Sequence, residues 1–162
     1  MCSFAWVSKK RKTNQKQLGR MGELLAALEL EGMGYETSLV DAPGYDLIVN
    51  YKDRPLRIQV KSGHPFAKNA TSKTKRYTYQ TNVGAEKRPL GRASADILCV
   101  VASDLRKCLF IIVPKKGFAT SLKMYPSAFE EDNVMQESWE KCLKKLAPSR
   151  EETRDRCGCN RG

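Results

Sequence analysis

The sequence has little histidine, and its cysteines do not follow a recognisable spacing. Among 162 residues there is one histidine, and the six cysteines are scattered without the spacing of a disulfide framework. A structural zinc site therefore has little support, even at the closely spaced Cys157 and Cys159. Cys99, Cys108 and Cys142 lie in apolar runs, and we expect them to be buried free thiols.

Long apolar runs and acidic residues are also in short supply. No run is long enough to span a bilayer and no secretory signal follows Met1, so we expect an intracellular, cytoplasmic protein. Acidic residues number 18 against 29 lysines and arginines, which gives a formal net charge of +11. This excess favours a polyanionic partner, with nucleic acid ahead of an acidic membrane surface.

The chain divides into three parts by composition. Residues 1–17 form a basic arm that is either a solvated terminus or a segment lying along phosphates. Residues 18–147 carry the apolar patterning of a single domain, which is long enough to bury a core. Residues 148–162 are charged and lack apolar anchors, so we expect this tail to be disordered.

Residues 45–61 alternate between apolar and polar side chains on either side of a turn at 52–55, which predicts a β-hairpin. Side chains two apart on a strand project to the same face, so Gln59 and Lys61 lie together. Antiparallel pairing brings Asp46, near the start of the first strand, close to the end of the second. We therefore expect a carboxylate, an amide and an amine to converge on one face, with a packed apolar layer on the other.

A first helix is predicted at 18–33, where apolar residues recur at helical spacing and glycines follow. Glu23 is either an ordinary surface charge on this helix or a carboxylate directed toward Asp46. The apolar stripe of the helix, which we expect to face the core, consists of Met21, Leu24, Leu25 and Leu28.

The remaining elements predict an α/β fold. A strand is expected at 35–40, and the continuous apolar runs at 95–102 and 108–114 are typical of central strands covered on both faces. With the hairpin they give a mixed β-sheet of about five strands flanked by helices. A second helix is expected at 126–146, and its apolar face consists of Met135, Trp139, Cys142, Leu143 and Leu146.

Residues 62–92 are polar, basic and poorly periodic, so we expect a long loop with one short strand around Tyr77 and Tyr79. The loop is either a mobile solvated segment or a nucleic-acid contact. In a contact, basic side chains neutralise phosphates, and the tyrosines stack on bases or wedge into a groove. The predicted DNA-binding residues are Lys68, Lys73, Lys75, Arg76, Tyr77, Tyr79, Lys87, Arg88, Arg92, Lys115 and Lys116.

The polar face of the hairpin suits phosphodiester hydrolysis. This reaction needs a divalent cation to stabilise the transition-state charge, an oriented water, and relief of charge on the leaving oxygen. Mg²⁺ prefers octahedral oxygen ligation and commonly takes one or two carboxylates. Asp46, the backbone carbonyl of Val60 and the amide oxygen of Gln59 supply such ligands. Lys61 beside them can position the attacking water or hold the phosphate.

Three segments resemble the PD-(D/E)XK nuclease superfamily in their order along the chain: Glu23, Pro43-Gly44-Tyr45-Asp46 and Gln59-Val60-Lys61. They look most similar to the small branch that contains group I intron-encoded homing endonucleases, and archaeal Holliday-junction resolvases are more distant. The resemblance covers about residues 18–115 and implies a restriction-endonuclease-like core.

The resemblance also implies roles for single residues. Asp46 would hold Mg²⁺, Gln59 would help to ligate or orient it, and Lys61 would assist the water. Glu23 would be an outer ligand through water. Gln59 replaces the usual acidic residue, and because an amide brings an oxygen but no charge, the metal would be held more weakly. The homing-endonuclease branch is similar in carrying glutamine at this position.

These features predict a Mg²⁺-dependent endonuclease for double-stranded DNA, of homing or restriction type, in which Mn²⁺ substitutes for Mg²⁺. Since both strands must be cut, a homo-oligomer, either a dimer or a tetramer, is expected. Two alternatives stay open. One is a structure-selective Holliday-junction resolvase, and the other is a DNA-binding module that has lost turnover, which the neutral side chain of Gln59 allows.

Overall fold

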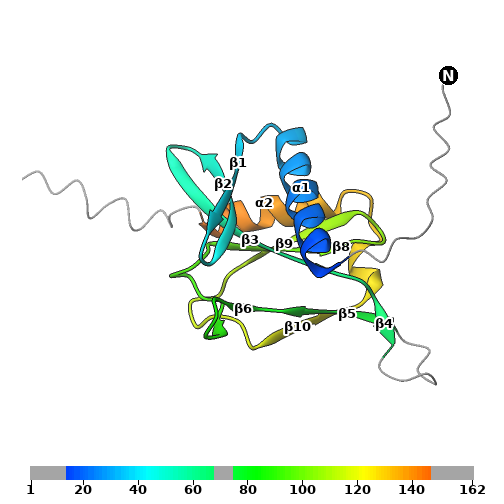
Figure 1. Ribbon diagram of the computed structural model, residues 1–162. Coiled ribbons are helices and arrows are strands. Elements are labelled where there is room, and N and C mark those ends of the chain that lie inside the picture. The colour runs from blue at the N-terminus through cyan, green and yellow to red at the C-terminus, as the bar shows by residue number, and fades with distance from the viewer. Residues whose placement is uncertain (1–13, 68–74, 147–162) are drawn as a thin grey trace, which may run out of the picture.

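The computed structural model describes residues 14–67 and 75–146, and its centre is a five-stranded sheet (Figure 1). The strands are β1 (Thr37–Ala42), β2 (Tyr45–Tyr51), β3 (Arg54–Gly63), β8 (Ile97–Ala102) and β9 (Lys107–Ile112). They lie side by side in the order β1-β2-β3-β8-β9, with β3 and β8 parallel and the other neighbours antiparallel. The predicted α/β fold with a mixed sheet of about five strands is confirmed.

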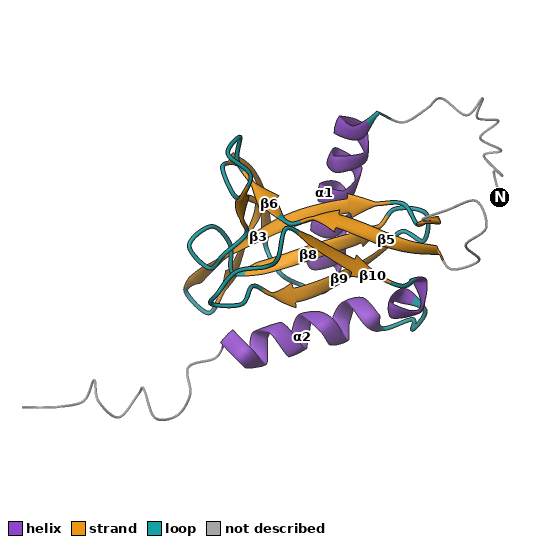
Figure 2. Ribbon diagram, turned by 90° about the horizontal axis from the view of Figure 1, so that it is seen from below, coloured by secondary structure: helices purple, strands orange, loops and turns teal. Residues whose placement is uncertain are grey.

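Helices cover one face of this sheet, and a smaller sheet covers the other (Figures 1 and 2). Helices α1 (Gln15–Gly32) and α2 (Val134–Leu146) pack on the first face through one apolar cluster. On the second face, strands β4 (Phe66–Ala67), β5 (Lys75–Gln80) and β10 (Ser121–Met124) form a three-stranded sheet over a second cluster. Both faces of the central strands are therefore buried, as their continuous apolar sequence predicts.

Helix α1 begins within the predicted basic arm, three residues earlier than the sequence pattern indicates. Asn14 caps it: its side chain accepts a hydrogen bond from the Gln17 backbone N–H at 2.8 Å, and the Gln17 side chain accepts one from the Asn14 N–H at 3.1 Å. This capping box satisfies two donors that the first helical turn leaves free. The rest of the predicted arm, and the predicted disordered tail, lie outside the described residues.

The face of α1 that meets the sheet is not the predicted one. The helix buries Leu18, Gly22, Ala26 and Leu30, while Met21, Leu24 and Leu28 are exposed, so the predicted orientation of the apolar stripe is wrong. Close approach explains the difference. A Cβ added to Gly22 would lie 1.8 Å from the Ser62 hydroxyl oxygen, so only a residue without a side chain fits where α1 crosses β3.

The β2–β3 hairpin is confirmed, with a tighter turn than predicted. Only Lys52 and Asp53 separate the strands, and their φ angles of 46° and 60° are those of a two-residue turn that matches the twist of the hairpin. Leu47 lies opposite Ile58, and both are fully buried. This register continues toward Asp46 and Gln59 at the end of the paired strands, and the apolar layer lies on the helix side of the sheet.

The segment at 62–92 contains more regular structure than a loop. It includes the end of β3, strands β4 and β5, and a small hairpin made of β6 (Asn82–Val83) and β7 (Arg88–Pro89). The short strand predicted around Tyr77 and Tyr79 is confirmed as β5. Its partner β10 has no counterpart among the predicted elements, because its four residues are too few to show a period.

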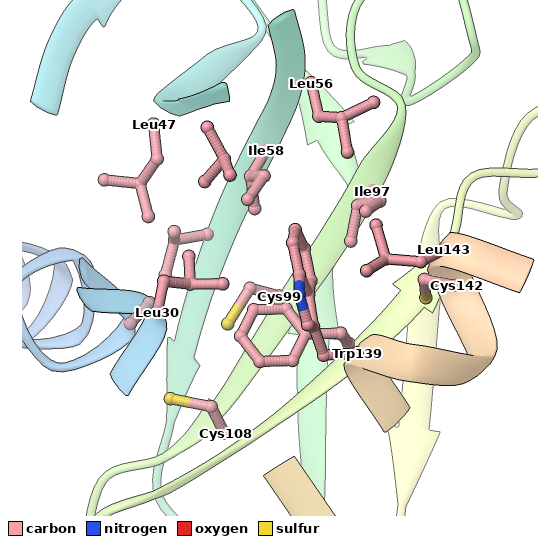
Figure 3. Close-up of a cluster of buried hydrophobic side chains, with 14 of the residues drawn as sticks. Leu30, Leu47, Leu56, Ile58, Ile97, Cys99, Cys108, Trp139, Cys142 and Leu143 are labelled. Carbon is pink, nitrogen blue, oxygen red and sulfur yellow. The ribbon is translucent and has the colours of Figure 1, made fainter. Parts of the chain in front are cut away.

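The predicted second helix is divided in two. A 3₁₀ turn, η1 (Pro126–Phe129), precedes α2, whose Trp139 lies fully buried between Tyr35 and Phe110 with edge-on ring contacts. Figure 3 shows the indole among the sulfur-bearing side chains of this cluster. Cys99, Cys108 and Cys142 are buried free thiols, as predicted. In the described ranges no helix is both long and apolar enough to cross a membrane.

Candidate active site

The polar end of the β2–β3 hairpin brings Asp46, Gln59 and Val60 into direct contact. The Val60 backbone N–H donates a hydrogen bond to Asp46 Oδ2 at 2.7 Å. The Gln59 amide nitrogen donates to the same oxygen, and to the Val60 carbonyl oxygen at 3.3 Å. Antiparallel pairing produces this geometry because it sets the start of β2 against the end of β3. The predicted convergence of the carboxylate and the amide is therefore present.

Lys61 follows two residues after Gln59 on β3 and is half-buried. Burial lowers the pKa of its amine, because a charged ammonium loses solvation there, and the carboxylate of Asp46 partly offsets this by favouring the charged form. Lys61 therefore has a larger neutral fraction than a solvated lysine. It is also close enough to Asp46 for the two charges to act on each other.

The carboxylate of Asp46 carries the opposite shift. Burial raises its pKa, the Val60 N–H lowers it, the negative charge of Glu23 raises it, and Lys61 and Gln59 lower it. The net direction is upward, so the ionised carboxylate is poorly solvated here. A cation beside Asp46 would replace the lost solvation.

Glu23 lies on α1 next to the point where the helix crosses β3. Gly22 sits against Ser62, and this contact holds the helix close enough for the Glu23 charge to act on Asp46. Its carboxylate accepts a hydrogen bond from Arg20 at 2.9 Å, and its side chain is 26 % exposed. Of the two readings of Glu23 from the sequence, the one that turns it toward Asp46 fits this placement, although Arg20 is its direct partner.

The oxygen atoms at this site are ligands of the kind that a hard divalent cation binds. The Gln59 amide nitrogen bridges two oxygens, one from Asp46 and one from the Val60 backbone. If this amide turns over, its own oxygen faces the same point, and three oxygens then surround it. No cluster of three His, Cys, Asp or Glu side chains arranged to hold a metal occurs in residues 14–67 and 75–146. A cation would therefore depend on the amide and backbone oxygens as well as on Asp46.

The predicted DNA-binding residues differ in their exposure to solvent. Lys75, Lys87, Arg88, Lys115 and Lys116 are exposed and Arg76 is half-buried, whereas Lys68 and Lys73 lie outside the described residues. Tyr77 and Tyr79 are 0 % and 1 % exposed and pack in the second core cluster. Neither ring presents a face to a base, so the prediction that they stack on nucleic acid is wrong. They are core residues of β5, and the Tyr77 hydroxyl donates to Asp104 at 2.8 Å.

Arg57 holds a segment beside the site, and the sequence analysis did not single it out. Its three guanidinium nitrogens donate to the Asp96 carboxylate at 3.2 and 3.4 Å and to the backbone carbonyls of Ala93 and Arg92 at 2.7 Å each. The signal in the sequence was Asp96, an acidic residue at the head of a wholly apolar strand. A buried carboxylate there requires a cationic partner.

This clamp supports the turn that leads into Asp46. Gly44, with φ of 100°, lies so close to Ser94 that an added Cβ would be 2.9 Å from the Ser94 Cβ. Ser94 belongs to the segment that Arg57 fastens to β3. The turn at Pro43-Gly44 therefore needs a glycine, because the backbone there lies against Ser94. By holding the segment that contains Ser94, Arg57 helps to position the start of β2, where Asp46 lies.

Comparisons with known proteins agree with this architecture. A family model described as PD-(D/E)XK endonuclease matches residues 13–140. Among solved structures, a bacterial homing endonuclease, I-Ssp6803I, matches with a TM-score of 0.61 and 19 % sequence identity, covering 86 % of this chain and 98 % of that chain. A comparison with curated proteins found no match.

The protein is therefore a nuclease with a restriction-endonuclease-like fold. The chain belongs to the PD-(D/E)XK endonuclease family, and the resemblance recognised in the sequence is confirmed. Enzymes of this family act on DNA and generally use divalent metal ions. The likeness to the homing endonuclease, at 19 % identity, is a likeness of fold.

Proposed function

We propose that this protein is a Mg²⁺-dependent endonuclease that hydrolyses phosphodiester bonds in double-stranded DNA, of the homing or restriction type, acting inside the cell. The observation that carries the proposal is the meeting of Asp46, Gln59 and the Val60 carbonyl at one point, with Lys61 beside it. Family membership supplies the nuclease class, and this geometry supplies the residues for the chemistry.

The residues that would hold the metal are Asp46, the Val60 carbonyl and, after rotation of its amide, Gln59, with Glu23 contributing through water. When bound, Mg²⁺ supplies charge stabilisation at the phosphate and lowers the pKa of a coordinated water, and Mn²⁺ is expected to substitute. The neutral Gln59 contributes an oxygen without a charge, so the protein places one carboxylate in direct contact and keeps the second at a distance.

Lys61 acts on the attacking water. Burial lowers the pKa of the amine at Nζ and so favours its neutral form, the form that can accept a proton from the water and orient it. The negative charge of Asp46 opposes this shift, because it favours the charged form of the amine. Glu23, whose charge acts on Asp46, adds the negative charge that a cation needs when Gln59 provides none.

The substrate side of the proposal rests on exposed basic residues. Four lysines, Lys75, Lys87, Lys115 and Lys116, are solvent-exposed and form no ion pair with another described residue. Lysines of this kind neutralise phosphates without reading base sequence. Cutting both strands of a duplex with one site per chain requires more than one copy, so we propose that the enzyme acts as a homo-oligomer.

A cleavage assay tests the proposal. The full chain is incubated with linear plasmid DNA and with a synthetic four-way junction, with and without Mg²⁺. Mg²⁺-dependent cutting of the linear duplex is expected. Cutting confined to the junction would instead identify a structure-selective resolvase, and binding without cutting under all conditions would identify a DNA-binding module.

Variants assign the roles within this assay. Lys61→Ala should abolish cleavage and leave DNA affinity near that of the wild type, while Lys144→Ala, at an exposed lysine of α2, serves as the matched control. Asp46→Asn should reduce Mg²⁺-dependent cleavage by about a hundredfold or more, because it removes the one charged ligand. Full activity in either active-site variant would contradict the role given to that residue.

A further inference from the structure

The exposed large apolar side chains of this protein gather around one helix. In the described residues, Met21, Leu24 and Leu28 on α1 are 56 %, 48 % and 66 % exposed. Leu39 on β1, the strand that packs beside α1, and Leu105, in the turn after β8, are exposed as well. We call these five residues the α1 face. The sixth exposed large hydrophobic residue, Tyr125, precedes η1 and lies apart from them.

The α1 face lies on the helix side of the sheet. Leu39 pairs with Leu47, a residue of the helix-side core, so its side chain points to the same side as α1. Figure 1 shows α1 at the periphery on this side of the sheet, with β1 next to it. Met21, Leu24 and Leu28 follow one another at helical spacing along one stripe of α1. An exposed apolar stripe of this kind marks an interaction site, because its exposure to water is unfavourable.

A cleft next to the helix continues this apolar surface. It has a volume of about 240 Å³ and is lined mainly by Met21, Leu24, Leu25, Val101 and Arg106. A volume of this size holds one or two aliphatic side chains. The α1 face therefore offers both projecting leucines and a cleft that accepts leucines, which is the requirement for packing against a copy of itself.

The charges that border the apolar stripe are arranged for self-pairing. Arg20 and Glu31 are eleven residues apart, which is close to three turns of an α-helix, so both lie on the same flank of α1, one toward each end. Both are exposed. If a second α1 runs antiparallel to the first, Arg20 of each helix faces Glu31 of the other. A parallel arrangement would place the two copies of this flank on opposite sides of the helix pair, so Arg20 and Glu31 would not meet across it.

We propose that the α1 face binds the same face of a second copy of this chain, as an antiparallel helix pair about a two-fold axis beside Leu24 and Leu25. In this arrangement Met21 lies opposite Leu28 of the partner subunit, and the leucine side chains of each copy enter the cleft of the other. The contact is isologous and closed, so it forms a dimer that cannot extend into a filament.

A second copy fits this face better than the other candidate occupant. DNA binds through phosphates, and a surface of leucine and methionine offers no partner for them. The whole chain carries a net charge of +11, which opposes self-association except where the contacting surface is apolar and carries both signs of charge. The α1 face meets both conditions.

The arrangement would also join two catalytic sites in one particle, and this consequence rests on the proposed function. Glu23 lies on the opposite side of α1 from the stripe, against β3. Each helix of the pair would therefore contribute apolar residues to the dimer and a carboxylate to its own active site. The assembly itself is measured without DNA or Mg²⁺, so its failure and the failure of the nuclease proposal are distinguishable.

Sedimentation equilibrium of the full chain tests the proposal. The wild type is expected to be a dimer or a higher oligomer built from dimers, and Leu24→Glu and Leu28→Glu should each raise the dimer dissociation constant by about a hundredfold or more, because a two-fold interface contains each substitution twice. Tyr125→Glu, at a residue 54 % exposed outside the α1 face, is the matched control and should leave association unchanged. Circular dichroism checks that each variant is folded.

A charge reversal supplies an independent readout. Arg20→Glu and Glu31→Arg should each weaken the dimer by about tenfold, and the double variant should recover most of the loss because the pairs are re-formed in reversed sense. A wild type that stays monomeric at its highest soluble concentration would overturn the proposal. So would dimers that survive both leucine substitutions, or single charge reversals whose effects simply add in the double variant.

Discussion

Helices α1 and α2 lie on the same face of the same sheet, yet they use opposite rules to bind it. Helix α2 buries its large residues: Trp139, Cys142, Leu143 and Leu146 enter the core, and its apolar face is the one that the sequence predicts. Helix α1 buries Leu18 and Leu30 toward its ends but only Gly22 and Ala26 between them, and it turns Met21, Leu24 and Leu28 outward. Where α1 crosses β3 it therefore approaches more closely than a large side chain allows, and this crossing lies next to Glu23, whose charge acts on Asp46.

The difference shows that the residues on the buried face of a helix set how closely the helix approaches the sheet. A helix that only covers a core gains most by burying large side chains, as α2 does. A helix that must bring a carboxylate close to a strand cannot have a leucine side chain between the helix backbone and that strand. Gly22 on Ser62 brings α1 close to β3, so Glu23 reaches the electrostatic range of Asp46. The apolar residues that this leaves outside become available for another contact.

The largest effect is expected where α2 is most deeply seated. Trp139→Ala removes a fully buried indole that packs against Tyr35 and Phe110, and it should lower the free energy of unfolding by about 3–5 kcal/mol. Urea denaturation measures this loss. A change below about 1 kcal/mol would mean that α2 does not close the core as described.

The next effect compares two leucines of α1. Leu30 is fully buried and Leu28 is 66 % exposed, so Leu30→Ala should cost about 2–5 kcal/mol and Leu28→Ala less than about 0.5 kcal/mol in the monomer. Urea denaturation at dilute protein concentration separates the two. Equal losses would show that the helix is turned toward the core by its predicted stripe, against the orientation found here.

A smaller loss of stability, combined with a loss of activity, is expected at the helix crossing. Gly22→Ala places a Cβ against Ser62 and should cost about 1–3 kcal/mol, together with about a tenfold loss of cleavage as Glu23 moves away. Adding Ser62→Ala removes the colliding hydroxyl and should restore part of both. Gly19→Ala is the matched control, because a Cβ at Gly19 meets nothing within 4 Å. Thermal unfolding and cleavage rates are compared across the wild type and these three variants.

The smallest effect concerns pH. The pKa of Asp46 is raised in the folded protein, mainly by burial, so the native state binds its proton more tightly than the unfolded chain. The contribution of Asp46 to stability is therefore fully present below the unfolded value of 3.8 and is lost as pH rises through the folded pKa. Asp46→Asn should melt at or above the wild-type temperature at neutral pH without divalent metal, by at most about 4 °C, and the gap should close in acid. A gap that widens in acid would reverse the assigned direction.

The parts of the fold that the sequence predicts are those set by local period. The alternation in 45–61 determines both strands of the hairpin, and their pairing brings Asp46 to Gln59. The continuous apolar runs likewise identify β8 and β9 as central strands. In each case the side-chain pattern is repeated often enough for the period and the face to be determined together.

The parts that the sequence did not predict depend on contacts between distant segments. Helical spacing places Met21, Leu24 and Leu28 on one stripe but does not say that the opposite side, with Gly22, is the one that meets Ser62. The burial of Tyr77 depends on strand β10, more than forty residues further along the chain. Charge density in 62–92 favoured a nucleic-acid loop, yet the two tyrosines in it belong to the second core cluster.

The clamp formed by Arg57 changes how the strong positive charge of this chain is to be counted. Arg57 gives its donors to Asp96 and to backbone carbonyls, Arg92 donates to the Val113 carbonyl at 2.6 Å, and Arg88 is paired with Glu86. These arginines hold the chain to itself and have few donors left for a polyanion. The salt dependence of DNA binding, which scales with phosphates neutralised at about 0.9 per contact, should therefore follow the free lysines and fall well short of the formal surplus of eleven.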